Sequence, residues 1–175
     1  MKITTTGIEG LFVLEPDRTK DFIEQFSVEK IKEIDNKVVF VQDNQSMSHR
    51  GVVRGMHFQT KFPYVKLIYA LQGSIYDVAV DLRKDSKTYK KWYGIELNSE
   101  NHKQLYIPTG FAHGFMALSD YTIVNFKVTE YYHPDNEAGF IWNDKEIGIS
   151  WPDEIKTVIL AEKDKRWPDF NYYKN

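Results

Sequence analysis

Hydrophobic and polar residues alternate in short runs along most of this chain. From residue 38 onward the runs are rich in Val, Ile, Tyr and Phe and are broken by glycines, prolines and polar turns, as is typical of an all-β fold. Apolar residues three apart between Ser27 and Ile34, with Glu29 in the first turn, predict one short helix. Strands are expected over residues 38–41, 51–58, 65–71, 74–81, 91–97, 104–107, 114–118 and 122–132.

The segment 74–81 shows the two faces of a strand clearly. Alternate residues fall on opposite faces, and one face is apolar or aromatic while the other includes Asp77. Many such strands must close or stack to hide their edges. The pattern alone is therefore compatible with a barrel, a double sheet or a jelly roll.

Length and composition then restrict the class of protein. A chain of 175 residues with 42% hydrophobic residues is expected to form one globular domain over 1–175. Its formal charge of −2 provides no general basic field for nucleic acid or an anionic membrane. With no cysteine, no signal sequence and no long apolar run, we expect a soluble cytoplasmic protein.

Charged side chains inside apolar strands are the candidates for chemistry. They are Arg54 and His57, Lys66, His113 and Lys127. A buried ionisable group is costly unless it is paired or used, although any one of these groups alone is more often structural. Their joint occurrence favours a functional site.

His57 is the candidate general base. In an ideal strand Arg54 and His57 point to opposite faces, but Gly55 between them is able to carry a bulge that turns one side chain. An imidazole acts as a base near neutral pH when a carboxylate fixes its tautomer, and the pattern does not identify that carboxylate. A buried Lys or Arg side chain is suited either to stabilise an oxyanion or to bind a phosphate, and the pattern does not separate these roles.

Metal binding is the main alternative use of histidines in a β-barrel. It usually needs several ligands at short spacing, whereas the five histidines, at 49, 57, 102, 113 and 133, are scattered. We therefore expect no metal site.

Several long segments carry a resemblance to a known family. They are FVQDNQS, GVVRGMHFQ, KLIYALQGSIYDVAVDLRKDS, ELNSENHKQLYIPTGFAHGFMALSD, WNDKEIGISWP and LAEKD. The chain resembles the dTDP-4-dehydrorhamnose 3,5-epimerases, the RmlC-like sugar epimerases. The resemblance implies a cupin-type jelly-roll barrel with a few short helices near its N-terminal and C-terminal ends. It also implies a homodimer that exchanges N-terminal strands and inverts centres beside the ketone of a nucleotide-linked 4-keto-6-deoxy sugar, without a cofactor.

The same resemblance assigns roles to individual residues. His57 corresponds to the base, Asp164 in LAEKD to its orienting carboxylate, and Lys66 to the group that stabilises the enolate. The positions expected to contact the diphosphate or the sugar are Arg54, Gln42, Asn44, His113 and, less closely matched, Tyr132.

The chain departs from the family pattern at two places. An arginine that reaches a phosphate in relatives is missing, and Lys20 stands near its place, while Phe22 and Glu24 still match positions near the base. Phe126 stands where relatives that act at both carbons have a tyrosine proton donor. The first departure makes dTDP an inference from the family, and the second predicts inversion at carbon 3 only.

Three alternatives remain open. The first is a full 3,5-epimerase. The second is a sugar-nucleotide ketoisomerase, which would move the ketone with a similar base. The third is a noncatalytic sugar-nucleotide-binding barrel, which the missing tyrosine makes conceivable.

Overall fold

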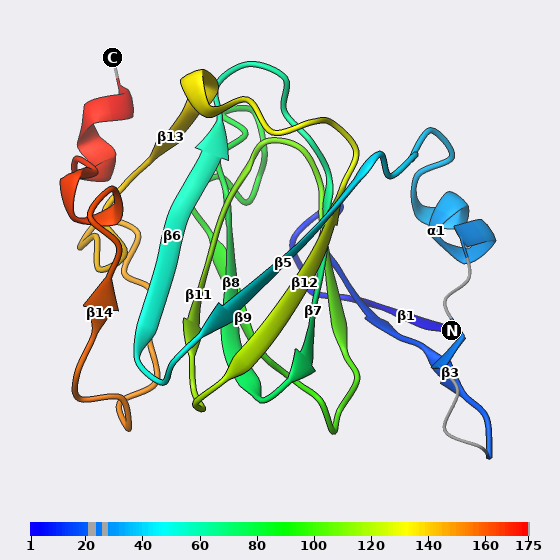
Figure 1. The fold of residues 1–175 in the computed structure, drawn as a ribbon. Coiled ribbons are helices and arrows are strands. Elements are labelled where there is room, and N and C mark those ends of the chain that lie inside the picture. The colour runs from blue at the N-terminus through cyan, green and yellow to red at the C-terminus, as the bar shows by residue number, and fades with distance from the viewer. Residues whose placement is uncertain (21–23, 26–27, 175) are drawn as a thin grey trace.

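Two six-stranded sheets form the body of the molecule (Figure 1). This computed structural model describes residues 1–20, 24–25 and 28–174. One sheet has the order β1-β2-β10-β7-β12-β5 and the other β13-β6-β11-β8-β9, with β14 paired to β6. The first sheet comprises β1 (Lys2–Thr5), β2 (Phe12–Glu15), β10 (Gln104–Ile107), β7 (Lys66–Gln72), β12 (Thr122–Val128) and β5 (Gln42–Ser48). The second comprises β13 (Glu137–Gly139), β6 (Val52–Gln59), β11 (Phe111–Ala117), β8 (Ser74–Asp81), β9 (Trp92–Asn98) and β14 (Ile159–Leu160).

Helices are few and short, as the sequence predicts. The expected N-terminal helix is α1 (Val28–Ile34), which follows the small ribbon of β3 (Asp17–Arg18) and β4 (Glu24–Gln25). Turns of 3-10 helix lie at η1 (Pro134–Asn136), η2 (Asp164–Arg166) and η3 (Phe170–Lys174). No helix of the described residues is long and apolar enough to cross a membrane.

The interior between the sheets is apolar at one end. Side chains from both sheets, among them Ile68, Val124, Ile75 and Phe115, form one buried cluster there. Within β8 the expected faces are confirmed, since Ile75 and Ala79 face this cluster and Val78 packs on the outer side of its sheet. The C-terminal segment covers that outer side, and α1 covers the outer side of the other sheet.

Several predicted strand positions are wrong. Residues 38–41 form no strand: Val38 packs beneath α1, while Val39 and Val41 are exposed. The strand is instead the polar β5, whose Asn44 and Ser46 border a cavity between the sheets, so the strand lacks the expected apolar alternation. The predicted strand 122–132 ends at Val128, and β1, β2, β13 and β14 were not predicted.

The predicted irregularity at Gly55 is present. The pairing of β6 with β11 shifts register between His113 and Phe115, so that His57 pairs with His113 and Arg54 with Phe115. Gly55 has φ +133°, and a Cβ there would lie 2.5 Å from the Cα of Gly114. The close approach of the two strands requires glycine, and the bulge brings Arg54 and His57 to one cavity.

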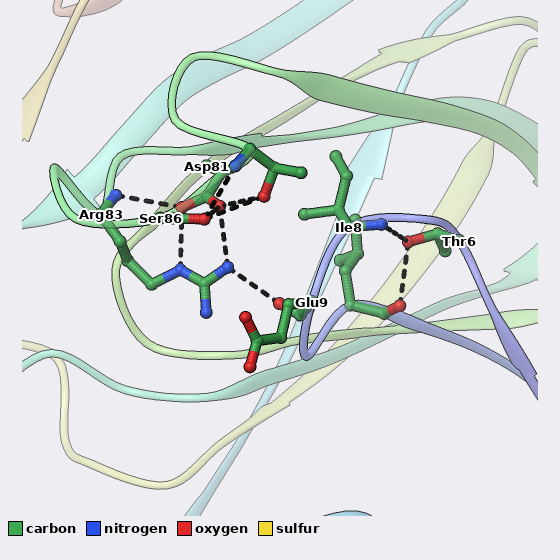
Figure 2. Close-up of polar contacts among 8 residues, drawn as sticks. Thr6, Ile8, Glu9, Asp81, Arg83 and Ser86 are labelled. Atoms are coloured by element: carbon green, nitrogen blue, oxygen red, sulfur yellow. Dashed lines mark hydrogen bonds and ion pairs between the residues drawn. The ribbon is translucent and has the colours of Figure 1, made fainter.

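A polar network fixes one end of the barrel (Figure 2). Arg83 donates through Nη2 to Asp81 Oδ2 (2.7 Å) and to the carbonyl oxygen of Glu9 (2.9 Å), and Ser86 Oγ donates to Asp81 Oδ2 (2.6 Å). Burial raises the pKa of Asp81, but these donors outweigh it and bring the pKa to about 2. The guanidinium also lies 4.8 Å from the ring centroid of Phe111, a residue of the cavity wall.

Candidate active site

A cavity of about 670 Å³ lies between the two sheets. Its wall combines side chains from β6, β11, β5, β7 and β12 with Glu137 of β13 and with Lys163 and Asp164 at the start of η2. The predicted residues that line it are Asn44, Arg54, His57, Lys66, His113, Phe126, Tyr132 and Asp164. The fold therefore gathers into one space residues that lie far apart in the sequence, from Asn44 to Asp164.

His57 and Asp164 form a hydrogen-bonded pair. The Nε2 atom of His57 lies 2.5 Å from Asp164 Oδ1, which also accepts a hydrogen bond from Trp167 Nε1 (3.1 Å). Burial raises the pKa of Asp164, but the hydrogen bond and charge of His57, with Trp167 and Lys163, outweigh it and lower the pKa below its usual value. An ionised Asp164 fixes the imidazole proton on Nε2, which leaves the Nδ1 lone pair available.

Glu137 lies beside the other ring nitrogen of His57. Its Oε1 is 3.9 Å from His57 Nδ1, and its Oε2 accepts hydrogen bonds from Lys163 Nζ (2.7 Å) and Tyr132 Oη (3.1 Å). Burial, with the neighbouring carboxylate, raises the pKa of Tyr132 to about 12. This arrangement holds Tyr132 and Lys163 at the cavity beside the imidazole.

A second histidine–carboxylate pair lies on the neighbouring strands. His113 Nε2 is 2.8 Å from Asp77 Oδ1, and both side chains are nearly inaccessible to solvent. The Nδ1 atom of His113 is 3.4 Å from Lys66 Nζ. Because a lysine ammonium only donates, this nitrogen accepts and the ring proton lies on Nε2, where it is donated to Asp77.

Lys66 is the cation of the cavity interior. Burial lowers its pKa to about 8, although Asp77 and Glu137 oppose that shift. At neutral pH the group is still mainly an ammonium. It can therefore donate to an oxyanion in the cavity while it holds His113.

Arg54 and Asn44 lie on the polar part of the wall. Arg54 is oriented by hydrogen bonds from Nε to Ser48 Oγ (3.2 Å) and from Nη2 to the carbonyl oxygen of Met47 (3.2 Å). Asn44 Oδ1 accepts a hydrogen bond from Gln42 Nε2 (2.7 Å). Gln42 itself does not line the cavity, so it is placed to orient Asn44.

Other predicted site residues are not in the cavity. Lys20 is exposed and is not part of the wall. Phe22 lies outside the described residues, as does the side chain of Glu24. Lys127 points away from the cavity and pairs with Asp43, its Nζ 2.5 Å from Oδ2.

Sequence reasoning missed several polar residues of the site. Asp77 carried a signal, as an acid in the middle of an apolar strand, and its Oδ2 has no hydrogen-bond partner among the described residues. Tyr64, Lys163 and Trp167 lie outside the strands, Glu137 begins the three-residue strand β13, and none of them carried a periodic signal. The described residues hold no group of three or more His, Asp or Glu side chains arranged for a metal ion.

Comparison with known proteins identifies the family. A family model described as dTDP-4-dehydrorhamnose 3,5-epimerase matches residues 5–172. The chain belongs to this family. A dTDP-4-dehydrorhamnose 3,5-epimerase of Methanothermobacter thermautotrophicus is 49% identical over 167 residues, which are 93% of this chain and 90% of the relative.

Solved structures of the family agree with the fold. The dTDP-6-deoxy-D-glucose-3,5-epimerase RmlC of Legionella pneumophila, in complex with dTDP-4-keto-L-rhamnose, has a TM-score of 0.93 and 37% identity over 98% of this chain and 94% of that one. ChmJ of Streptomyces bikiniensis, a 3′-monoepimerase in complex with dTDP-quinovose, has a TM-score of 0.84 and 26% identity over 93% and 85%. The predicted jelly-roll fold and the predicted enzyme class, an isomerase that epimerises a sugar, are confirmed. Because the fold carries both single and double epimerases, the family leaves the number of inversions open.

Proposed function

We propose that the protein inverts carbon 3, beside the ketone of a dTDP-linked 4-keto-6-deoxy sugar, and leaves carbon 5 unchanged. The observation that carries the proposal is Phe126, which lines the cavity from the sheet opposite that of His57. Inversion needs a base on one face of the ring and an acid on the other. A phenyl ring has no proton to give, so the second inversion is left without a donor.

His57 is the base of this mechanism. Asp164 holds the ring proton on Nε2, so Nδ1 takes the proton from carbon 3, and the carboxylate stabilises the imidazolium that forms. The electrons left behind make an enolate whose negative oxygen needs a donor already in place. Lys66 is positioned as that donor, since it projects into the cavity from β7.

The polar wall is suited to bind the rest of the substrate. Arg54 and Asn44 offer a guanidinium and an amide for the diphosphate or sugar, and Gln42 orients the amide. The ring of His113 lies in the same wall beside Lys66, within reach of the sugar. Support for dTDP comes from the relatives, because the Legionella enzyme was solved with dTDP-4-keto-L-rhamnose. Lys20 is exposed and outside the cavity wall, so we assign it no contact with the substrate.

Inversion at both carbons is the second candidate. It is supported by the names of the relatives, since the Methanothermobacter protein is a 3,5-epimerase at 49% identity. Single inversion is supported by Phe126 and by the 3′-monoepimerase ChmJ, which has the same fold. No particular observation favours a ketoisomerase or a noncatalytic barrel.

Proton exchange in heavy water tests the proposal. The dTDP-4-keto-6-deoxyglucose substrate is incubated with the native protein and with Phe126→Tyr, and carbons 3 and 5 are followed by NMR. Deuterium is expected at carbon 3 alone with the native protein and also at carbon 5 with the variant. Rapid exchange with inversion at carbon 5 by the native protein would instead establish the 3,5-epimerase.

Three further expectations stay predictions. They are a single domain over 1–175, a homodimer that exchanges N-terminal strands, and a cytoplasmic location. Sedimentation of the full chain, compared with a chain that lacks β1, measures the dimer directly.

A further inference from the structure

We infer that Tyr64 is the proton donor that serves carbon 3 in place of the missing tyrosine. The inference rests on the proposed function, which provides a base on one face of the ring but names no acid on the other. It concerns a residue that the sequence analysis did not select.

Tyr64 comes from the correct side of the cavity. It lies two residues before β7, whose sheet also carries Phe126 and stands opposite the sheet that carries His57. Tyr64 and Lys66 are two residues apart along the chain and both line the cavity, as side chains on one face of a strand do. The backbone beside it is fixed, because Val65 N donates to Thr129 Oγ1 (3.0 Å) and Thr129 N donates to the carbonyl oxygen of Val65 (3.3 Å).

The lysines and the other tyrosine of the described cavity wall are already engaged, and Ser46 Oγ, which lines the wall without a hydrogen-bond partner, is an aliphatic hydroxyl and a much weaker acid than a phenol. Lys163 is bound to both oxygens of Glu137, and Lys66 hydrogen bonds to His113 and is assigned to the enolate oxygen. Tyr132 is the other tyrosine of that wall, and its hydroxyl donates to Glu137 Oε2 (3.1 Å). A phenolate formed at Tyr132 would lie directly against this carboxylate, which makes the loss of its proton unfavourable.

The surroundings of Tyr64 keep it protonated and place a positive charge beside it. Burial raises the pKa of Tyr64, and the charge of Glu137 adds to the rise, so the phenol is protonated at neutral pH. The amide nitrogen of Gln59 is placed to donate to the carbonyl oxygens of His133 and Asn136 (3.2 Å each), which leaves the amide oxygen for the phenol. The Nζ atom of Lys66 lies 5.5 Å from the centre of the Tyr64 ring, where its positive charge stabilises a phenolate.

The proposed inversion moves two protons, one on each face of the sugar ring. His57 Nδ1 removes the proton from carbon 3, and the C–H electron pair forms the enolate, whose oxygen is bound by Lys66. The O–H bond of Tyr64 then breaks as a new C–H bond forms on the opposite face, and the ketone is restored. The imidazolium of His57 afterwards releases its proton to water, and the phenolate of Tyr64 takes one from water.

The test separates proton removal from inversion. Tyr64→Phe is compared in heavy water with the native protein and with Tyr93→Phe, which removes a half-buried hydroxyl outside the cavity. In Tyr64→Phe we expect inversion at carbon 3 to fall about 100-fold or more. Deuterium should still enter carbon 3 with retained configuration, because His57 can return a deuteron to the face from which it took the proton.

Three outcomes would overturn the assignment of Tyr64. One is inversion by Tyr64→Phe at the native rate. The second is a rise in KM with unchanged kcat, and the third is loss of exchange together with inversion; either of these assigns Tyr64 to binding or structure. Failure of the proposed function is a separate result, since the native protein itself would then show no exchange at carbon 3.

Discussion

Two histidine–carboxylate pairs lie side by side in this cavity and differ in what their second ring nitrogen meets. His57 on β6 pairs directly with His113 on β11, and each donates its Nε2 proton to a buried aspartate. The Nδ1 atom of His57 faces the cavity beside Glu137, whereas that of His113 faces Lys66. A carboxylate partner alone therefore does not make a histidine a base. Whether such a histidine acts as a base depends on what its other ring nitrogen contacts.

The physical consequence is a division of roles. Burial lowers the pKa of His113, against the opposing effect of Asp77, and the charge of Lys66 lowers it further. A neutral His113 accepts from Lys66 and keeps its ammonium directed into the cavity. His57 is more exposed, at 17% of its side chain against 9% for His113, and its Nδ1 atom has room for a substrate.

Removal of His57 is expected to have the largest effect. His57→Ala removes the base, so deuterium uptake at carbon 3 should fall by about 10³–10⁴-fold, as is typical when a positioned general base is lost. The measurement is the NMR exchange rate at saturating substrate, with thermal unfolding as the check on the fold. Native exchange in this variant would show that another group removes the proton.

The second prediction compares two variants in which one of the two aspartates is replaced by asparagine. Asp164→Asn should slow exchange by on the order of 10²-fold, because the amide neither fixes the proton on Nε2 nor stabilises the imidazolium. Asp77→Asn should cost only about tenfold, since it disturbs the orientation of Lys66 and leaves the base intact. The matched pair is assayed by the same NMR exchange. Equal effects in the two variants would contradict the division of roles.

The sequence predicted much of the fold because most strands are short runs rich in Val, Ile, Tyr and Phe between turn residues. Residues 74–81 are strand β8 with the predicted faces. The prediction failed where the environment of a strand is not apolar, as in β5, whose polar residues border the cavity. Short edge elements such as β13 bury too few residues to show a period.

The candidate site was predictable in part for a similar reason. His57 and Lys66 are anomalies in apolar strands, so the pattern exposes them. Asp164 and Trp167 lie at a 3-10 turn near the C-terminus, and only tertiary contact makes Asp164 a buried partner of His57. For Asp164 the family resemblance provided what periodicity could not.

The smallest expected effect, about twofold at pH 8, is the onset of a pH dependence that belongs to Lys66. Its pKa of about 8 lies below the usual value, so the protonated donor is present below pH 8 and is lost as the pH rises through 8. The rate at carbon 3 should fall to about half near pH 8 and then about tenfold for each further unit, if the ammonium is required. The profile is measured as kcat against pH from 6 to about 10.

The contribution of Lys66 to the stability of the folded protein should rise with pH over the same range. A loss of rate there is therefore distinguishable from unfolding. The unfolded chain holds the Lys66 proton up to its ordinary pKa of 10.5, whereas the folded protein releases it near 8. Between these values the unfolded state binds more protons, so the contribution of Lys66 to stability rises with pH. Lys66→Arg keeps its charge throughout this range and should lose the fall in rate above pH 8, even if its overall rate is lower. A fall that persists unchanged in Lys66→Arg would assign it to another group and leave the role of the His113–Lys66 contact unsupported.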